Sequence, residues 1–188
     1  SLYQDLITNK IWSIKRFNYG FRNVLSNHLM TIFLGSPYVD LRVDFNSWLP
    51  KKLDNKISEK LINYYLSTFI KNKNLHDKVE FEILFTCHTP QTKSKLKDKL
   101  KNILNIKEIN ELELCLKDIN RKTFENYFID KSKILTLQEK QIKLKKSKMN
   151  NIDKIYWLVE DCKNLGTLPF AGLARSAFVS KEILLSLV

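Results

Sequence analysis

The sequence predicts a mainly α-helical protein with a small antiparallel β-sheet of two or three strands, an α+β fold. Three observations predict this class. Apolar residues recur at helical spacing through most of the 188-residue chain. Residues 92–148 are rich in Lys, Leu, Ile and Glu and contain neither Gly nor Pro, which favours helices. Only residues 38–46 and 79–86 alternate apolar and polar residues as half-buried strands do.

The first elements are a helix and a short apolar run. Apolar residues from Leu2 to Ile14 recur at helical spacing, so we expect a helix over residues 2–19 that ends near Gly20. Residues 29–34 form a short apolar run, and the turn-forming residues 35–37 close it.

The two alternating runs predict neighbouring strands. Pro50 ends the segment of the first run and Pro90 ends the second. If the strands pair, their polar faces align, and Arg42 lies opposite Glu80 or Glu82.

The remaining elements are predicted to be helices. We expect a helix over residues 54–71 with Asp54 as its N-cap. Residues 92–148 predict two or three helices that form a helical insertion or a protruding hairpin. Seven Lys and one Glu in residues 131–148 indicate a solvated basic face.

The C-terminal part predicts two separate helices. The first covers residues 151–164, with Asp153 near its start and Gly166 as its C-terminal cap. The second covers residues 169–187, with Pro169 near its start.

The composition limits the classes of partner. The formal net charge is +12, but only five of the 32 basic residues are Arg. Because Arg is the usual residue for bidentate recognition of phosphates and bases, a Lys excess indicates a solvated surface and argues against nucleic-acid binding. Three widely spaced cysteines favour a reducing compartment, and no signal peptide is visible, so we expect a cytoplasmic protein. No apolar run approaches a membrane span, and we expect no membrane partner.

Charged residues on the first predicted strand form a candidate ligand site. Asp40, Arg42 and Asp44 lie on one face of that strand, where Arg can bind a carboxylate and Asp an ammonium group. Glu80 and Glu82 of the second strand extend this face. The alternative is an exposed strand face whose charges neutralise one another.

Two further segments carry candidate binding residues. Residues 166–175 end one helix and begin another, so Arg175 can assist an anion at a helix N-terminus. The alternative there is tight helix packing through Ala171, Gly172 and Ala174. Tyr19 and Arg22 follow the first helix and can face a ligand; burial of the Tyr19 ring is the alternative.

Catalytic and metal motifs are weak. Cys87 and His88 point to opposite faces of the predicted strand, so they cannot form a nucleophile–base pair. The spacing of the three His and three Cys residues argues against structural zinc. The four glycines exclude a Gly-rich phosphate loop.

Four stretches together resemble a known family. They are residues 12–23 with the motif Asn-Tyr-Gly-Phe-Arg-Asn, residues 37–48 with Tyr-Val-Asp-Leu-Arg, residues 75–87 with Val-Glu-Phe-Glu-Ile, and residues 154–175. Their order resembles the middle region of phosphoenolpyruvate synthase-like phosphotransferases, and among these it is most similar to the L-glutamine kinases of capsule phosphoramidate biosynthesis. The resemblance covers most of the chain outside residues 90–150.

The resemblance implies a larger enzyme. An ATP-grasp-type domain that uses ATP and Mg²⁺ precedes this region in the family, and a domain carrying a phosphorylated His follows it. None of His28, His76 or His88 matches that carrier motif. We therefore expect residues 1–188 to be a single central, acceptor-side domain without its own cofactor, and a fragment inactive by itself. Both ends lie within apolar helical runs, which agrees with a fragment.

Acceptor binding gives each candidate residue a role. Arg42 and Arg175 bind an acceptor carboxylate or phosphate, and Tyr19 and Arg22 wall the site. The acidic residues bind an ammonium group, an amide or Mg²⁺; they are Asp40, Asp44, Glu80 and Glu82. The alternatives are a non-catalytic helical connector and a basic nucleic-acid-binding module.

Overall fold

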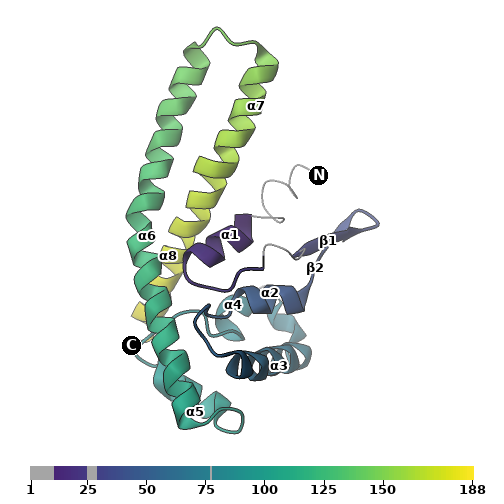
Figure 1. The fold of residues 1–188 in the computed structure, drawn as a ribbon, viewed down its shortest axis with the longest axis vertical. Coiled ribbons are helices and arrows are strands. Elements are labelled where there is room, and N and C mark those ends of the chain that lie inside the picture. The colour runs from purple at the N-terminus through teal and green to yellow at the C-terminus, as the bar shows by residue number, and fades with distance from the viewer. Residues whose placement is uncertain (1–10, 25–28, 77) are drawn as a thin grey trace.

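The computed structural model describes residues 11–24, 29–76 and 78–188. Within them the chain is mainly helical, with one two-stranded antiparallel sheet, so the predicted fold class is confirmed. Figure 1 shows a helical body from which a long helical hairpin and a short β-hairpin project. Among the described residues no helix is long and apolar enough to cross a membrane.

The body encloses the apolar core. It is built from α1 (Ile11–Asn18), α2 (Leu41–Ser47), α3 (Asn55–Lys71), α4 (Val79–Glu82), α5 (Thr92–Leu100) and the first part of α6 (Ile106–Lys146). A short 3-10 helix, η2 (Lys73–Leu75), follows α3. Aromatic rings from separate segments meet in the core, where Phe45 packs edge-on against Tyr65 with ring centroids 6.2 Å apart. The largest fully buried side chains include Tyr19, Phe21, Phe45, Tyr65, Leu61, Leu112 and Leu116.

Helix α3 follows its predicted boundaries closely. The side chain of Asp54 accepts hydrogen bonds from the backbone N–H groups of Lys56 and Ile57, as the N-cap prediction requires. Of the helix predicted over residues 2–19, the structure describes α1; residues 2–10 lie outside the described residues. Gly20, which follows α1, has φ +96°, a conformation that favours glycine and ends the helix.

The long hairpin consists of α6 and the helices after it. Helix α6 begins with a capping box between Asn105 and Glu108 and runs for 41 residues. Helix α7 (Asn151–Asp161) returns alongside it, followed by η3 (Cys162–Thr167), a π-helical segment, and α8 (Leu168–Leu185) (Figure 1). The returning arm therefore comes after residue 148, whereas α5 and α6 occupy most of residues 92–148.

The predicted break at Gly166 is wrong. Gly166 does not have a positive φ and caps nothing; helical backbone continues from α7 through η3 into α8. The wider π-helical turn of η3 accommodates Gly166 and Pro169 without ending the helix. Because the chain stays helical, α8 has no free N-terminal N–H groups for the anion site expected there.

The sheet lies earlier in the chain than predicted. Strand β1 (Met30–Phe33) pairs with β2 (Ser36–Val39) in antiparallel register, with Met30 opposite Val39. The strand predicted over residues 38–46 is wrong beyond Val39, because Asp40 caps helix α2. The Oδ1 atom of Asp40 accepts hydrogen bonds from the backbone N–H groups of Arg42 at 2.9 Å and Val43 at 3.0 Å.

The second predicted strand, residues 79–86, is also wrong. Val79–Glu82 forms the single helical turn α4, and Ile83 and Leu84 after it are both buried. Two adjacent buried residues do not follow the alternation of a half-buried strand. The expected pairing of Arg42 with Glu80 or Glu82 across a sheet therefore does not form.

Candidate functional site

An aromatic cavity of about 270 Å³ lies where α1, α2, α4 and α8 meet. Helices α1 and α8 supply most of its wall, Trp48 caps the C-terminus of α2, and Glu80 comes from the single turn α4. Its lining residues are Trp12, Lys15, Arg16, Tyr19, Trp48, Glu80, Ala171, Ala174, Arg175 and Phe178. Aromatic walls with a few converging charged groups are typical of small-molecule sites.

Two guanidinium groups share the ring of Trp48. The Cζ atom of Arg16 lies 3.9 Å from the ring centroid and that of Arg175 lies 5.2 Å from it. Arg175 also lies 5.0 Å from the ring centroid of Phe21. These distances are within the range of cation–π attraction, which holds both guanidinium groups in defined positions.

Each guanidinium is also paired with a carboxylate. Arg16 donates to Asp44 Oδ1 at 2.6 Å and to the hydroxyl of Ser47. Arg175 donates to Glu80 Oε1, and its Nη2 donates to the carbonyl of Thr86 at 2.7 Å. Burial raises the pKa of Glu80, although Arg175 acts in the opposite direction. Within the described residues, the buried Nε of Arg175 has no hydrogen-bond partner.

A second ionic cluster supports the cavity from α6. Asp130 forms an ion pair with Lys15 and accepts a hydrogen bond of 3.0 Å from the hydroxyl of Tyr19. All three side chains are buried. Burial lowers the pKa of Lys15 and, with Asp130, raises the pKa of Tyr19. The long hairpin is thereby joined to the cavity wall, and Gly172 packs directly against this cluster.

The cavity brings together four of the eight predicted site residues. Tyr19, Glu80 and Arg175 line it, and Asp44 holds Arg16. Burial of the Tyr19 ring, the alternative considered from the sequence, is what the structure shows, although its hydroxyl group remains part of the site.

The other four residues lie elsewhere. Asp40 caps α2, while Arg22 and Arg42 line a separate cleft. Glu82 borders a third hollow that Thr92 and Lys95 also line. The predicted single site is thus divided among several surfaces, because its strands do not exist.

Sequence reasoning missed several residues of the cavity and its support, namely Trp12, Lys15, Arg16, Trp48, Asp130 and Phe178. Trp12, Arg16 and Tyr19 follow the spacing i, i+4, i+7 and share one face of the first helix, a signal that was available. Lys15 lies on the same face. Trp48 and Asp130 had no local signal, because only the tertiary fold brings them to α1.

The acidic residues do not assemble a magnesium site. Asp44 and Glu80 are each bonded to an arginine, which leaves no cluster of free carboxylates. Across residues 11–24, 29–76 and 78–188, no group of three potential metal ligands is found. The residues of this cavity therefore do not fit a cation of the Mg²⁺ type.

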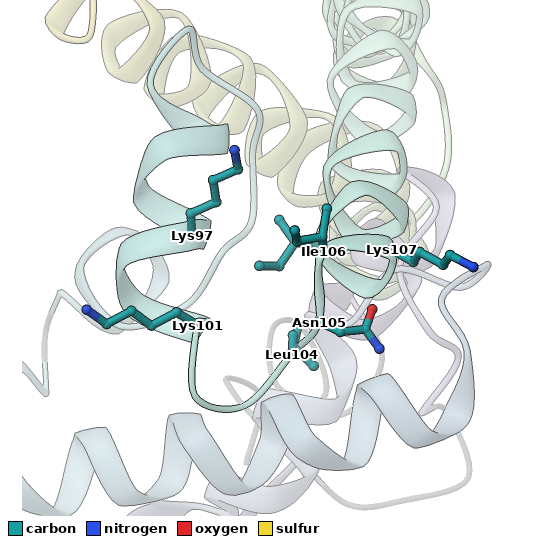
Figure 2. A pocket seen from close by; sticks show the side chains of 7 residues that line it. Lys97, Lys101, Leu104, Asn105, Ile106 and Lys107 are labelled. Carbon is teal, nitrogen blue, oxygen red and sulfur yellow. The ribbon is translucent and has the colours of Figure 1, made fainter.

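A second hollow has a different character. It is an open depression of about 730 Å³ between the end of α5 and the start of α6. Figure 2 shows that the ammonium groups of Lys97, Lys101 and Lys107 point away from one another. Without converging polar groups, this hollow is a poor candidate for a specific ligand site.

Comparisons with protein-family models, with curated proteins and with solved structures find no match to this chain. The family resemblance of the sequence therefore remains a prediction, and the function is inferred from the geometry of the cavity.

The charges of the cavity balance. Three cationic groups, Lys15, Arg16 and Arg175, are matched by the carboxylates Asp44, Glu80 and Asp130. A ligand with a net charge would disturb this balance, whereas a zwitterion can exchange partners with both kinds of group. The arrangement favours binding and orientation over covalent chemistry, because each of these charged side chains is held in an ion pair.

Proposed function

We propose that this chain is the acceptor-binding domain of a cytoplasmic, ATP-dependent phosphotransferase of the phosphoenolpyruvate synthase type, with L-glutamine as the favoured acceptor. One observation carries the proposal: the aromatic cavity places two ion-paired guanidinium groups against Trp48 with no excess charge. The sequence resemblance supplies the reaction class, with ATP, Mg²⁺ and the phosphorylated His belonging to other domains of the parent protein.

The cavity offers complementary groups for an amino acid. The acceptor carboxylate binds Arg16 and Arg175, and its ammonium group binds Glu80. Its side chain lies along Trp12 and Phe178, which are apolar parts of the wall. Such binding orients the acceptor for the incoming phosphoryl group, and positioning is the main requirement in phosphoryl transfer.

A helical connector is the second candidate, and one observation favours it. Arg16 and Arg175 are already paired within the chain, so the two ion pairs can serve only to join α1 to α2 and α8 to α4. A connector would keep these pairs in every state of the parent protein. A binding domain would exchange them for ligand contacts.

Tryptophan fluorescence separates the two candidates. Of the three tryptophans, Trp12 and Trp48 line the cavity and Trp157 lies exposed on α7. In a Trp157→Phe variant the emission therefore reports on the cavity alone. We expect saturable quenching by L-glutamine and a weaker response to glutarate, which lacks the ammonium group.

Two further measurements complete the test. Arg16→Gln should weaken the response by about tenfold, because a charge-assisted hydrogen bond is lost, whereas Arg121→Gln on the exposed face of α6 should not change it. No saturable response at millimolar L-glutamine would reject the acceptor site and favour the connector. In the parent protein, ³¹P NMR should show ATP-dependent phosphorylation of glutamine.

A further inference from the structure

Two of the five arginines are not paired with acidic side chains. Arg16, Arg121 and Arg175 each form an ion pair with a carboxylate. Within the described residues, Arg22 and Arg42 form none. Both line the same cleft, which lies outside the aromatic cavity, so two guanidinium groups without an ion-pair partner among the described residues lie on one surface.

The cleft has two adjoining parts, which share Arg22, Arg42 and Asn46. The first part, about 360 Å³, contains no carboxylate and is lined by Arg22, Asn23, Val24, Arg42, Val43 and Asn46. The second part, about 220 Å³, extends over the first turns of α3 and adds Asn55, Ser58, Glu59, Ile62 and Asn63. The two arginines therefore lie where the parts adjoin, and the carboxylate of Glu59 belongs to the second part alone.

Arg22 is held in place through one nitrogen. Its Nη2 donates to Leu53 O at 3.2 Å, Asn55 Oδ1 at 2.9 Å and Ser58 Oγ at 2.6 Å. Its Nη1 and Nε make no hydrogen bond with the described residues and remain as donors. A guanidinium that is fixed on one side and unbonded on the other loses little entropy when it binds an anion.

Two acidic residues next to the cleft in sequence, Asp40 and Asp54, serve as helix caps. Asp40 accepts hydrogen bonds from the backbone N–H groups of Arg42 and Val43. Asp54 accepts from the backbone N–H groups of Lys56 and Ile57 at 2.8 and 3.3 Å. Because both carboxylates satisfy backbone donors, neither forms an ion pair with Arg22 or Arg42.

The side chains of the second part match hydroxyl groups. Carboxamides both donate and accept hydrogen bonds, and the exposed Glu59 adds a carboxylate that accepts them. Asn55 uses its oxygen on Arg22, which leaves its NH₂ group as a donor. The hydroxyl groups of a polyhydroxylated molecule can both donate hydrogen bonds to such a surface and accept them from it.

We propose that the Arg22–Arg42 cleft binds a sugar phosphate. The phosphate group lies between Arg22 and Arg42, whose two positive charges match a dianionic monoester. The hydroxyl groups lie over the exposed Asn55, Glu59 and Asn63. The site is independent of the acceptor proposed for the aromatic cavity, and its test does not depend on that proposal.

Calorimetric titration of the full chain tests the site with three probes: glucose 6-phosphate, inorganic phosphate and glucose. We expect glucose 6-phosphate to bind more tightly than inorganic phosphate, and glucose to bind most weakly. Arg42→Gln, at an exposed position, should weaken both phosphate-bearing probes by at least about tenfold. Arg121→Gln is the matched control and should leave all three affinities unchanged.

A second variant tests the hydroxyl-binding part. Asn63→Ala should weaken glucose 6-phosphate but not inorganic phosphate, because the exposed Asn63 lies only in the second part of the cleft. Absence of phosphate binding, or binding that Arg42→Gln does not reduce, would overturn the site. Equal affinities for glucose 6-phosphate and inorganic phosphate would overturn the assignment of the ligand as a sugar phosphate.

Discussion

Arg175 on α8 forms an ion pair with Glu80, a residue that lies 95 positions earlier in the chain. The Arg175 side chain is 6% exposed and that of Glu80 is 30% exposed. This pair ties the C-terminal helix to the single turn α4, beside which the aromatic cavity opens. Its removal therefore tests both the fold and the cavity.

Replacement of Arg175 by Met should destabilise the protein by about 3 kcal/mol, because Glu80 keeps a partly buried charge without a partner. The double variant Arg175→Met/Glu80→Gln should recover part of this loss. Chemical denaturation of both variants measures the difference. A double variant less stable than Arg175→Met would contradict the role of Glu80.

The pH dependence of the Arg175→Met variant follows from the pKa of Glu80, which burial already raises in the native chain. Without Arg175 that pKa rises further, so the folded state binds a proton more readily than the unfolded state. Stability is therefore retained below the ordinary pKa of Glu and lost as the pH rises through the folded value. We expect the Arg175→Met variant to lose more stability at pH 8 than at pH 5.

Asp118 on α6 should determine part of the acid sensitivity of the body. Its carboxylate pairs with Arg121 at 2.6 Å, with Lys52 at 3.2 Å and with Lys122 at 3.3 Å. The hydrogen bond from Arg121 is the largest of the effects that lower its pKa to about 2. A carboxyl group with a lowered pKa stabilises the folded state at every pH above the ordinary pKa of Asp. This stability is lost as the pH falls toward 2.

Asp118→Asn should therefore reduce stability at neutral pH and flatten its decline between about pH 4 and 2. Thermal unfolding across that range measures the effect. Asp98→Asn on α5, which has no ion pair with the described residues, provides a control. An acid decline of the same steepness in Asp118→Asn and in the native chain would contradict this assignment.

The two false strands show how far the sequence predicts this fold. In residues 38–46 the alternation of Leu41 and Phe45 with polar residues also satisfies the i, i+4 spacing of a helix. Asp40 at the N-cap decides between the two, because its carboxylate satisfies the first N–H groups of α2. In α3 the same kind of cap, Asp54, coincides with a long helical pattern, and the prediction succeeds.

The candidate site was predictable only in part, for a physical reason. Arg175 and Glu80 were identified from residue chemistry, but the strand register wrongly placed Arg42 opposite Glu80 or Glu82. The actual partner of Glu80 comes from α8, and the partner of Lys15 is Asp130 on α6. Long-range ion pairs of this kind leave no periodic signal in one sequence.

Cysteine reactivity should follow burial. Burial raises the pKa of Cys87 to about 11, so at pH 8 only roughly one molecule in a thousand carries the reactive thiolate. Cys162 is exposed. Iodoacetamide should label Cys162 first, and mass spectrometry of timed samples identifies the order. Cys162→Ser should abolish the fast phase, whereas rapid labelling of Cys87 would contradict its burial.

Gly172 should be the least replaceable glycine in the long hairpin. A Cβ atom at this position would collide with Asp130 Oδ2, the Tyr19 hydroxyl and Lys15 Cε. Alanine ordinarily stabilises a helix relative to glycine by about 1 kcal/mol, but overpacking a buried cluster costs about 1–3 kcal/mol. We expect Gly172→Ala to lower the free energy of unfolding by about 2 kcal/mol and to displace Tyr19 from the cavity wall.

Gly166→Ala provides the matched control, since its Cβ would lie 3.5 Å from Leu137 Cδ2, an ordinary contact. This variant should be as stable as the native chain or up to about 1 kcal/mol more stable. Denaturant titrations of both variants give the comparison. If Gly172→Ala were as stable as Gly166→Ala, the Lys15–Asp130–Tyr19 cluster would not pack against α8 as tightly as the structure shows. Asp130 on α6 would then not support the cavity wall.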